Sequence, residues 1–425
     1  MRTVLMSLTL SRRLLVLGLV VSVGLLLGKL AGAGFGTPGG TAPRPLYGNA
    51  GDLVRIDPAT LRPLPGRRVP LVSDTWAWSF APGRSRLALA SDRPGPGLRL
   101  VDLRGMRLIG DVRLARRGSA WATAWVAPRR ILAVVVTRAD NTIVAGVDAA
   151  SRRVVWRRTL GGSLRAGERY RRSLLLVLGP RGRIGESRFV QVTPDGRLHS
   201  ASLPDIRSGS ETVETEPNGA FTLDSRPGLA IDRSGGRAFV VQADGPPAEV
   251  DLRTLQVRSH VLSPGGGSPD AATAGTRDVL WLGNGLLAVT GVDNHFSRGT
   301  RGRTWTTPAG LTLIDARRWS TRIIDDRATD VVRVGGTLVT SSWIEPGARA
   351  SGSGLTGYSF AGRRTFHRYG DEPMGVRPLG RRLLVAGPTR IVLIDARSLR
   401  ELRRFRRLPS SPLVGDQSFP PTAAG

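Results

Sequence analysis

Apolar and polar residues alternate along most of this chain in short runs, and one short pattern returns several times. Two or three apolar residues are followed by Asp, a polar turn and another apolar run. The first three such Asp residues stand at positions 57, 102 and 148, so they are 45 and then 46 residues apart. A repeat of this length indicates an array of similar supersecondary units. The six best copies are the segments 53–61, 98–102, 145–151, 249–255, 313–317 and 393–399.

The alternation within each repeat has the period of a β-strand. The second repeat divides into the apolar runs 76–80, 86–90, 98–101 and 108–114, and the third into 121–126, 131–137, 142–147 and 153–160. Four antiparallel strands in about 45 residues make one blade of a β-propeller. We therefore predict an all-β chain that forms a single β-propeller of seven or eight four-stranded blades.

The two ends of the chain decide between seven and eight blades. The first repeat, residues 46–72, has no evident inner strand. Either residues 413–419 supply that strand and close a ring of eight, or the first hairpin is peripheral and seven blades close the ring. Closure would leave no strand edge exposed. We assign residues 47–408 to the propeller and 409–425 to a Pro-rich tail that could close it.

The Asp of each repeat ends a strand, where its carboxylate can accept hydrogen bonds from backbone N–H groups two or three residues later. A Thr or Ser three residues after the Asp can support the same turn, and four repeats have one: Thr60, Ser151, Thr254 and Ser398. A ring of carboxylates could also hold a metal or act as acid and base. Because each Asp stands where a turn needs it, we interpret these residues as turn formers.

Two parts of the chain resemble known propeller repeats. Residues 229–241, with 80–83, resemble the strand–turn–strand of YVTN-type repeats. Residues 148–156 have the Asp, Ser and Trp spacing of repeats of the pyrroloquinoline-quinone (PQQ) type, with Arg152 where that family prefers Gly. The resemblance extends along nearly the whole chain and implies the propeller fold. Most such repeats bind no quinone, so it implies no cofactor.

Residues 1–36 have the composition of an export segment. Basic residues precede an uncharged apolar stretch at 14–28, and Lys29 and small residues follow it. As a helix this stretch spans about 22 Å, less than the ~30 Å hydrocarbon core, but a helix that continued to Gly36 could just span it. A cleaved signal peptide and a retained membrane anchor both remain open. Either one places the propeller outside the cytoplasm, secreted or anchored to the cytoplasmic membrane, after a Gly/Pro-rich linker at 37–46.

The formal net charge of +29 comes almost wholly from arginine, since Lys29 is the only lysine. Such a field favours anionic partners. The arginines are spread over every repeat without a basic helix or a stacking-aromatic motif, which argues against nucleic acid. We expect a protein, a glycan or another anionic partner of the cell envelope, with membrane contact through the N-terminal segment if it is retained.

Catalytic signatures are absent from the sequence. The chain has no cysteine, which excludes disulfides, thiol catalysis and lipoprotein acylation. Its four histidines, His199, His260, His295 and His367, fall in different repeats without a second ligand at metal spacing. We predict no catalytic residue, no metal site and no cofactor, and favour a binding or scaffold role over catalysis. The alternatives are a quinone-dependent dehydrogenase-like or polysaccharide-acting enzyme, and a polyanion or nucleic-acid binder.

The best candidate site is an insertion in the sixth repeat, which we expect to be a long loop at residues 291–310. It offers Asp293, His295, Arg298 and Trp305, which can pair charge, donate hydrogen bonds and stack on a sugar or aromatic ring. The alternative is a disordered, Arg/Gly-rich excursion. A second candidate is a set of tryptophans near the inner strands, which either pack between blades or form a ligand platform at the channel mouth: Trp76, Trp78, Trp121, Trp125, Trp281 and Trp343.

Overall fold

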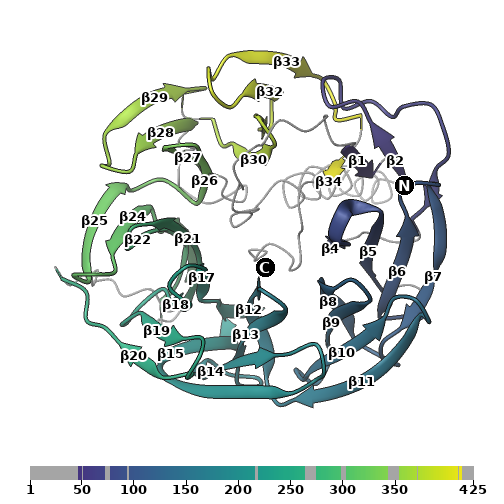
Figure 1. The fold of residues 1–425 in the computed structure, drawn as a ribbon. Helices are drawn as coiled ribbons and strands as arrows, with labels where there is room; N and C mark the ends of the chain where they lie inside the picture. The colour runs from purple at the N-terminus through teal and green to yellow at the C-terminus, as the bar shows by residue number, and fades with distance from the viewer. Residues whose placement is uncertain are drawn as a thin grey trace, which may run out of the picture.

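The strands form eight antiparallel sheets arranged as blades around a central axis (Figure 1). The protein is thus an eight-bladed β-propeller, the larger of the two rings that the sequence leaves open. The computed structural model describes residues 46–49, 51–71, 77–92, 95–215, 219–263, 274–297, 303–342, 354–370, 372–409 and 411–413. The predicted export segment at 1–36 lies outside these residues, and within them no helix is long and apolar enough to cross a membrane.

The strands of the first four blades follow from the inside of the ring outwards. Blade one has β34 (Ser411–Leu413), β1 (Leu46–Asn49), β2 (Asp52–Ile56) and β3 (Val69–Pro70). Blade two has β4 (Trp78–Phe80), the short 3₁₀ turn η1 (Pro82–Arg84), β5 (Arg86–Ser91), β6 (Gly97–Asp102) and β7 (Arg107–Arg113). Blade three has β8 (Ser119–Ala127), β9 (Arg130–Val136), β10 (Thr142–Asp148) and β11 (Arg153–Leu160). Blade four has β12 (Ser163–Tyr170), β13 (Ser173–Gly179), β14 (Gly185–Val192) and β15 (Leu198–Thr215), with β16 (Gly219–Ser225) added.

The second half of the ring has the same plan. Blade five has β17 (Gly228–Asp232), β18 (Arg237–Val241), β19 (Ala248–Asp251) and β20 (Val257–Ser259). Blade six has β21 (Ala274–Gly283), β22 (Leu286–Ser297), β24 (Leu311–Asp315) and β25 (Ser320–Asp325), and β23 (Arg303–Pro308) pairs with β22. Blade seven has β26 (Asp330–Val334), β27 (Thr337–Ser341), β28 (Leu355–Ser359) and β29 (Arg364–Arg368). Blade eight has β30 (Gly375–Leu379), β31 (Arg382–Ala386), β32 (Ile391–Asp395) and β33 (Glu401–Phe405).

Blade one is built from both ends of the chain. Strand β34 pairs with β1, with Leu413 opposite Tyr47 and Ser411 opposite Asn49. This strand begins two residues before the segment 413–419 that the sequence suggested. Leu413 is 4% exposed and packs in the core between blades one and two. The pairing gives blade one its fourth strand and satisfies the inner edge of β1.

All six repeated Asp residues form the predicted turns, because each carboxylate accepts the backbone N–H two residues later. The distances are 2.6 Å from Asp57 to Ala59 N, 3.2 Å from Asp102 to Arg104 N, 3.1 Å from Asp148 to Ala150 N, 2.8 Å from Asp251 to Arg253 N, 2.9 Å from Asp315 to Arg317 N and 3.1 Å from Asp395 to Arg397 N. At Asp148 and Asp395 the Ser hydroxyl three residues later also donates, at 3.0 and 2.8 Å. The interpretation as turn formers is confirmed.

The residue four positions after each Asp has a left-handed backbone, although none of the six is glycine. Its φ lies between 47° and 59° in every copy, at Leu61, Met106, Arg152, Leu255, Trp319 and Leu399. In each copy this side chain contacts the preceding blade. Leu61 packs on Leu379 and Leu384 of blade eight, and Arg152 donates to the Ile109 carbonyl of blade two at 2.9 Å. The positive φ also explains why related repeats prefer Gly where this chain has Arg152.

Trp156, the single tryptophan that matched the PQQ-type spacing, joins two blades. Its indole Nε1 donates to the carbonyl of Pro194 in the next blade at 2.9 Å. A Cβ at Gly146 or at Gly196 would overlap its ring, so both glycines allow the close packing. Trp156 therefore has a structural role between blades three and four.

Replacing Asp148 by Ala removes the acceptor for three hydrogen bonds of its turn. We expect the free energy of unfolding in urea to fall by about 1 kcal/mol at neutral pH. The hydrogen bond from the Ser151 N–H is the main reason that the pKa of Asp148 is lowered. The stabilisation is therefore complete above the unfolded pKa of about 3.9 and is lost as the pH falls through the lower folded pKa.

The matched control is Asp148→Asn, whose amide oxygen can accept the same backbone hydrogen bonds. This variant should lose less stability than Asp148→Ala, and the difference between wild type and Asp148→Ala should shrink in acid. An alanine variant as stable as the wild type at neutral pH would contradict the role of the turn.

Candidate functional site

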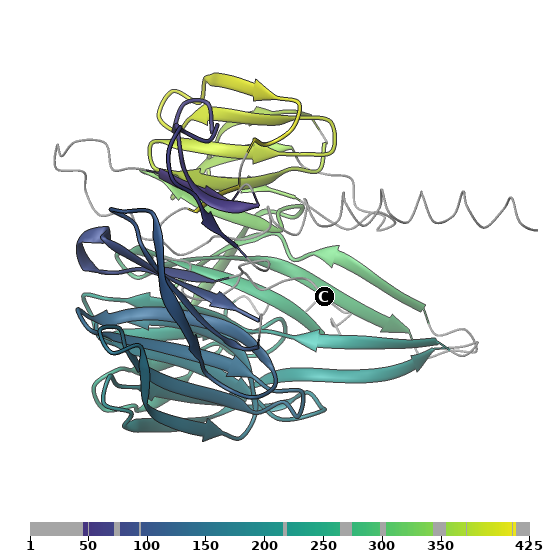
Figure 2. The ribbon, with the colours of Figure 1, turned by 90° about the vertical axis from the view of Figure 1, so that its right-hand side faces the viewer.

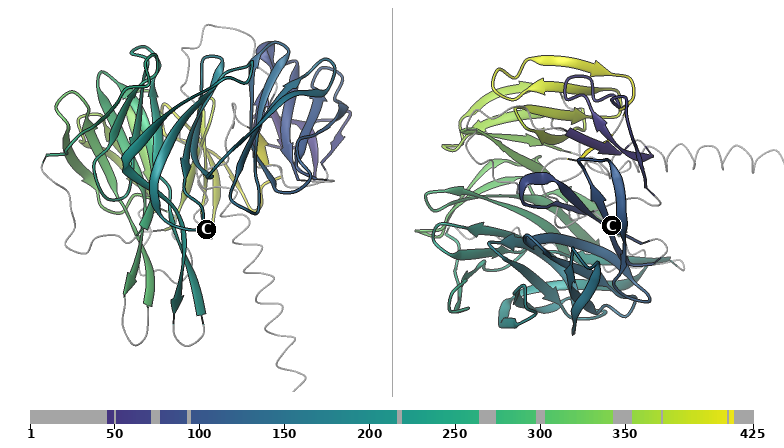
Figure 3. Two further views of the ribbon diagram at one scale, coloured as in Figure 1. Left: turned by 90° about the horizontal axis from the view of Figure 1, so that it is seen from below. Right: turned by 45° about the vertical axis from the view of Figure 1, so that its right-hand side comes forward.

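Two blades continue beyond the ring as two-stranded β-arms. In blade four, β15 leaves β14 after Ser208 and pairs with β16, from Gly209 opposite Ser225 outwards. In blade six, β22 extends past the ring and pairs with β23, with Val292 opposite Pro308. We call residues 209–225 the first arm and residues 292–308 the second arm. Figures 2 and 3 show that both project from the same face of the ring.

A glycine stands where each strand leaves its blade. Gly209 has a φ of +141° and Gly291 a φ of +145°, which side-chain-bearing residues rarely adopt. A Cβ would overlap the carbonyl oxygen of Arg183 at the first position and that of Thr276 at the second. The two glycines therefore allow β15 and β22 to bend away from the ring without steric conflict.

Backbone hydrogen bonds join the base of the first arm to the inner strand of blade six. The Arg226 N–H donates to the Gly275 carbonyl at 2.9 Å, and the Arg277 N–H donates to the Arg226 carbonyl at 2.9 Å. These bonds form a parallel bridge between Arg226 and Thr276. Because Thr276 lies in β21, the partner of β22, the first arm is braced directly against the sheet that carries the second.

A buried charged cluster lies beneath the first arm. Arg165 occupies a β-bulge in the inner strand β12, between the paired residues Leu164 and Ala166. Its Nη1 lies 2.9 Å from Asp224 Oδ1 and 2.8 Å from Ser210 Oγ, both in the arm. Arg226 forms a second ion pair with Asp224. Burial lowers the pKa of Arg165, and the Asp224 carboxylate opposes that shift.

Arg277 has the same role beneath the second arm. It is 8% exposed, and its Nη2 lies 2.7 Å from Asp293 Oδ1 and 3.0 Å from the Ala243 carbonyl. Its Nη1 donates to the carbonyl of Val292 at 3.2 Å. One guanidinium thus connects β21, the arm and the loop after β18 of blade five. The carboxylate of Asp293 is therefore held in an ion pair with Arg277 at the base of the arm.

The second arm presents an aromatic pair further out. The rings of His295 and Trp305, which are directly opposite in the strand register, stack with centroids 5.1 Å apart and planes 8° apart. His295 Nε2 lies 2.8 Å from Thr307 Oγ1. Trp305 is nevertheless 42% exposed. Side chains that alternate along a strand share a face, so Asp293, His295 and Trp305 lie on the same face of the arm.

The insertion that the sequence located is an ordered arm in the described residues, rather than the loop that we expected. Three of its four candidate residues lie together on that arm, and Arg298 lies outside the described residues.

The six tryptophans of the second candidate set do not form one site. Trp78 and Trp125 are buried in the core clusters between blades, and Trp281 stacks on Phe239 at 5.2 Å. Trp121 lies near the base of the first arm, since the Arg226 guanidinium is 6.0 Å from its ring. Trp76 and Trp343 lie outside the described residues.

The sequence analysis missed the first arm and the arginines that hold both arms. The alternating run before Pro217-Asn218-Gly219 is a hairpin signal that could have predicted that arm. No comparable signal distinguishes Arg165, Arg226 or Arg277 among the many arginines of the chain. Within the residues that the structure describes, no group of three or more His, Asp or Glu side chains could hold a metal ion.

Comparison with known proteins identifies the fold. No family model matches the chain, and no curated protein matches its sequence. Among solved structures, the chain is similar to the dihydro-heme d1 dehydrogenase NirN in complex with DHE, with a TM-score of 0.53 and 14% identity over 91% of this chain and 78% of that one. It is also similar to BamB from Moraxella catarrhalis, with a TM-score of 0.47 and 12% identity over 80% and 88% of the two chains. At these identities the shared property is the β-propeller.

Asp224→Ala removes the counter-charge of the buried Arg165 guanidinium. We expect the free energy of unfolding, measured in urea, to fall by about 3–5 kcal/mol, because an unpaired charge stays buried. The triple variant Arg165→Met/Asp224→Leu/Arg226→Met removes all three charges of the cluster and should recover most of the loss. A triple variant as unstable as Asp224→Ala would show that the charges do not account for the effect.

Proposed function

We propose that this protein is an extracytoplasmic binding or scaffold propeller that holds a partner on its two-armed face. The observation that carries the proposal is the pair of arms from different blades, braced at their bases by Arg165, Arg226 and Arg277. Binding groups on a rigid scaffold lose little conformational entropy when they engage a ligand. The buried ion pairs and backbone bonds give the arms such a scaffold.

The chemistry of the second arm favours a glycan as the partner. Trp305 offers an exposed indole face, and the stacked imidazole of His295 fixes its orientation. Thr307 Oγ1 lies 2.8 Å from His295 Nε2, and Thr307 is the register partner of Asp293, so a hydroxyl and a carboxylate lie on the same face of the arm as the aromatic pair. A flat aromatic surface beside hydrogen-bonding groups suits a sugar ring. A protein partner is the other outcome of the test below.

The location outside the cytoplasm is supported by the sequence of residues 1–36, a basic head followed by an apolar stretch and small residues. Both a cleaved signal and a retained anchor agree with it. Fractionation of cells that express the full chain tests the proposal. Recovery of the protein in the cytosol would contradict it.

The two alternative functions, an enzyme and a polyanion binder, rest on the fold and on the surface arginines. An enzyme acting on a polysaccharide or with a quinone shares the fold, and NirN is named as a dehydrogenase, but a likeness at 14% identity extends only to the fold. A polyanion binder would use the exposed arginines of the outermost strands, for example Arg157 in β11, Arg364 in β29 and Arg403 in β33. Charged side chains on outer strands also prevent edge-to-edge association, and that role needs no ligand.

A photo-crosslinking amino acid at position 305 in whole cells tests the proposed face. We expect one discrete crosslinked species, and its loss on digestion with a glycan hydrolase would identify a glycan. The matched control is position 155 on the outer strand β11, where the valine is 48% exposed. A crosslinker at position 222, in the exposed part of the first arm, should capture the same partner.

A shortened second arm provides the loss-of-function variant. Replacing residues 295–305 with Asn-Gly joins the register partners Asn294 and Thr306 by a two-residue hairpin turn, so the ring should fold unchanged. Crosslinking from position 222 should then disappear. Equal crosslinking from positions 155 and 305, or capture that survives the shortened arm and falls only with rising salt, would contradict the proposal and favour a polyanion bound at the rim.

A further inference from the structure

Three arginines occupy equivalent places in blades four, six and eight. Arg165 is the third residue of β12, Arg277 the fourth of β21 and Arg377 the third of β30, so each stands near the start of an inner strand. The blades follow the same path from the inner to the outer strand (Figure 1), so these starts lie on one face of the ring, from which the arms project. All three side chains are buried, and Arg377 is the most deeply buried, at 5% exposed.

The arms of blades four and six supply partners for two of these arginines. Asp224 of the first arm lies 2.9 Å from Arg165 Nη1, and Asp293 of the second arm lies 2.7 Å from Arg277 Nη2. Within the described residues, blade eight consists of four strands and has no arm. The structure therefore brings no arm carboxylate to Arg377.

Arg377 has a buried donor whose hydrogen bond is unused. Its Nε is enclosed, and none of the described residues accepts a hydrogen bond from it. Burial lowers the pKa of Arg377 to about 10, while the carboxylate of Asp330, at the start of β26 in blade seven, raises it. The guanidinium is thus charged at neutral pH, and Asp330 offsets only part of the cost of its burial.

Two buried hydroxyl groups lie at the same end of blade seven. Ser341 is opposite Asp330 in the strand register, and the carbonyl of Ser342 accepts the N–H of Met374, directly before β30, at 2.8 Å. Both serines are fully buried, and neither Oγ has a hydrogen-bond partner among the described residues. The place where β26 and β30 begin therefore has three buried polar groups with unused hydrogen bonds.

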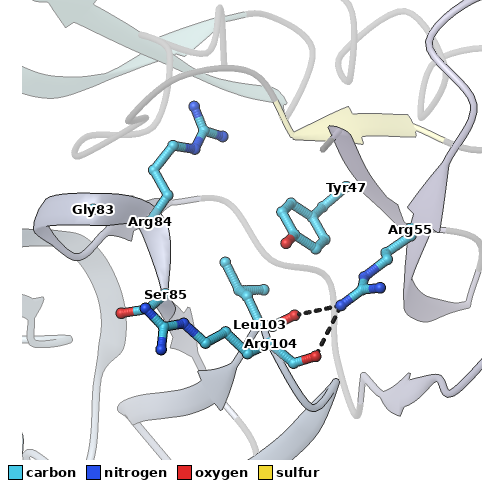
Figure 4. Close-up of a pocket in the computed structure, with 7 residues that line it drawn as sticks. All are labelled: Tyr47, Arg55, Gly83, Arg84, Ser85, Leu103 and Arg104. Atoms are coloured by element: carbon cyan, nitrogen blue, oxygen red, sulfur yellow. Dashed lines mark hydrogen bonds between the residues drawn. The ribbon is translucent and has the colours of Figure 1, made fainter. Parts of the chain in front are cut away.

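An arginine that only joins two blades has its donors in use. Arg55 crosses from blade one to blade two beside a cavity of about 330 Å³. Its Nη2 donates to the carbonyls of Leu103 at 3.1 Å and Arg104 at 2.9 Å (Figure 4). Buried polar groups in folded proteins are almost always satisfied in this way. The unused donor of Arg377 is therefore not explained by a role in joining blades.

We propose that the Arg377 guanidinium receives a carboxylate of the glycan held on the two-armed face, so that this glycan contains an acidic sugar. The inference rests on the proposed function. In blades four and six the equivalent guanidinium pairs with a carboxylate, and guanidinium and carboxylate groups match through two parallel hydrogen bonds. Because Arg377 is only slightly exposed, the group that reaches it must be small, as a carboxylate is.

Isothermal titration of the full chain with sodium glucuronate, and with glucose as the neutral counterpart, tests the proposal at constant ionic strength. We expect saturable binding of glucuronate at one site per chain and no binding of glucose. Arg377→Gln should weaken the affinity for glucuronate at least about tenfold, because it removes the charged donor. The matched control is Arg364→Gln, which removes an exposed charge on the outer strand β29 and should bind like the wild type. Equal affinity in wild type and Arg377→Gln, or no saturable binding of glucuronate, would overturn the proposal.

The melting temperature distinguishes a binding role of Arg377 from a structural one. Arg377→Met should raise the melting temperature, because it removes a buried charge whose Nε has no acceptor. Arg277→Met should lower it, because it leaves Asp293 without its ion-pair partner. A fall of similar size in both variants would mean that Arg377 supports the ring as Arg277 does, against the proposal.

Crosslinking from position 305 separates this inference from the proposed function. Arg377→Gln should reduce the capture of the glycan, and Arg364→Gln should leave it unchanged. Undiminished capture in Arg377→Gln would overturn the inference while the proposed function stands. If the wild type captures nothing, the proposed function fails, and the glucuronate titration still decides whether Arg377 binds a carboxylate.

Discussion

The ring depends on a turn that directs one side chain of a blade toward the blade before it. An Asp carboxylate closes the turn, and the residue four positions later takes a left-handed backbone conformation. For a residue with a side chain this conformation costs about 1–2 kcal/mol. Glycine would avoid the cost, but it would leave the blade interface without a side chain. Leu61 is fully buried on blade eight, and Leu255 and Leu399 pack on blades four and seven.

This arrangement gives the ring the stiffness that its two-armed face requires. Side chains from neighbouring blades share most of the core clusters, so a blade is held on both sides. Strand β34 extends this continuity across the junction of the two chain ends. On such a frame Arg165 and Arg277 can lie beneath the arms with their charges satisfied, which a flexible support would not allow.

The parts of the fold that depend on hydrophobic alternation could be predicted from the sequence. The four strands expected in blade three agree with β8 to β11 within about two residues, because each has apolar side chains that pack between blades, although those of β11 are mostly only half-buried. The Asp turns could be predicted because they depend on local hydrogen bonds. The second arm was expected to be a loop. Its strand β23 has the sequence Arg-Thr-Trp-Thr-Thr-Pro and belongs to an exposed hairpin, which buries no apolar face that a pattern could reveal.

The site was predicted less completely than the fold. Residues His295 and Trp305 could be found by their type, whereas Arg165 and Arg55 become distinctive only through partners remote in sequence.

The free energy of unfolding of Leu61→Gly tests the central claim that the left-handed residue is retained for its packing on the preceding blade. Glycine relieves the backbone strain but removes a fully buried side chain, which costs about 3–5 kcal/mol. We predict a net loss of about 1–4 kcal/mol for Leu61→Gly. The equivalent Arg152→Gly removes an exposed side chain and one hydrogen bond to the Ile109 carbonyl, which offsets the relief of backbone strain, so its stability should change by less than about 1 kcal/mol. A Leu61→Gly protein as stable as the wild type would contradict the claim.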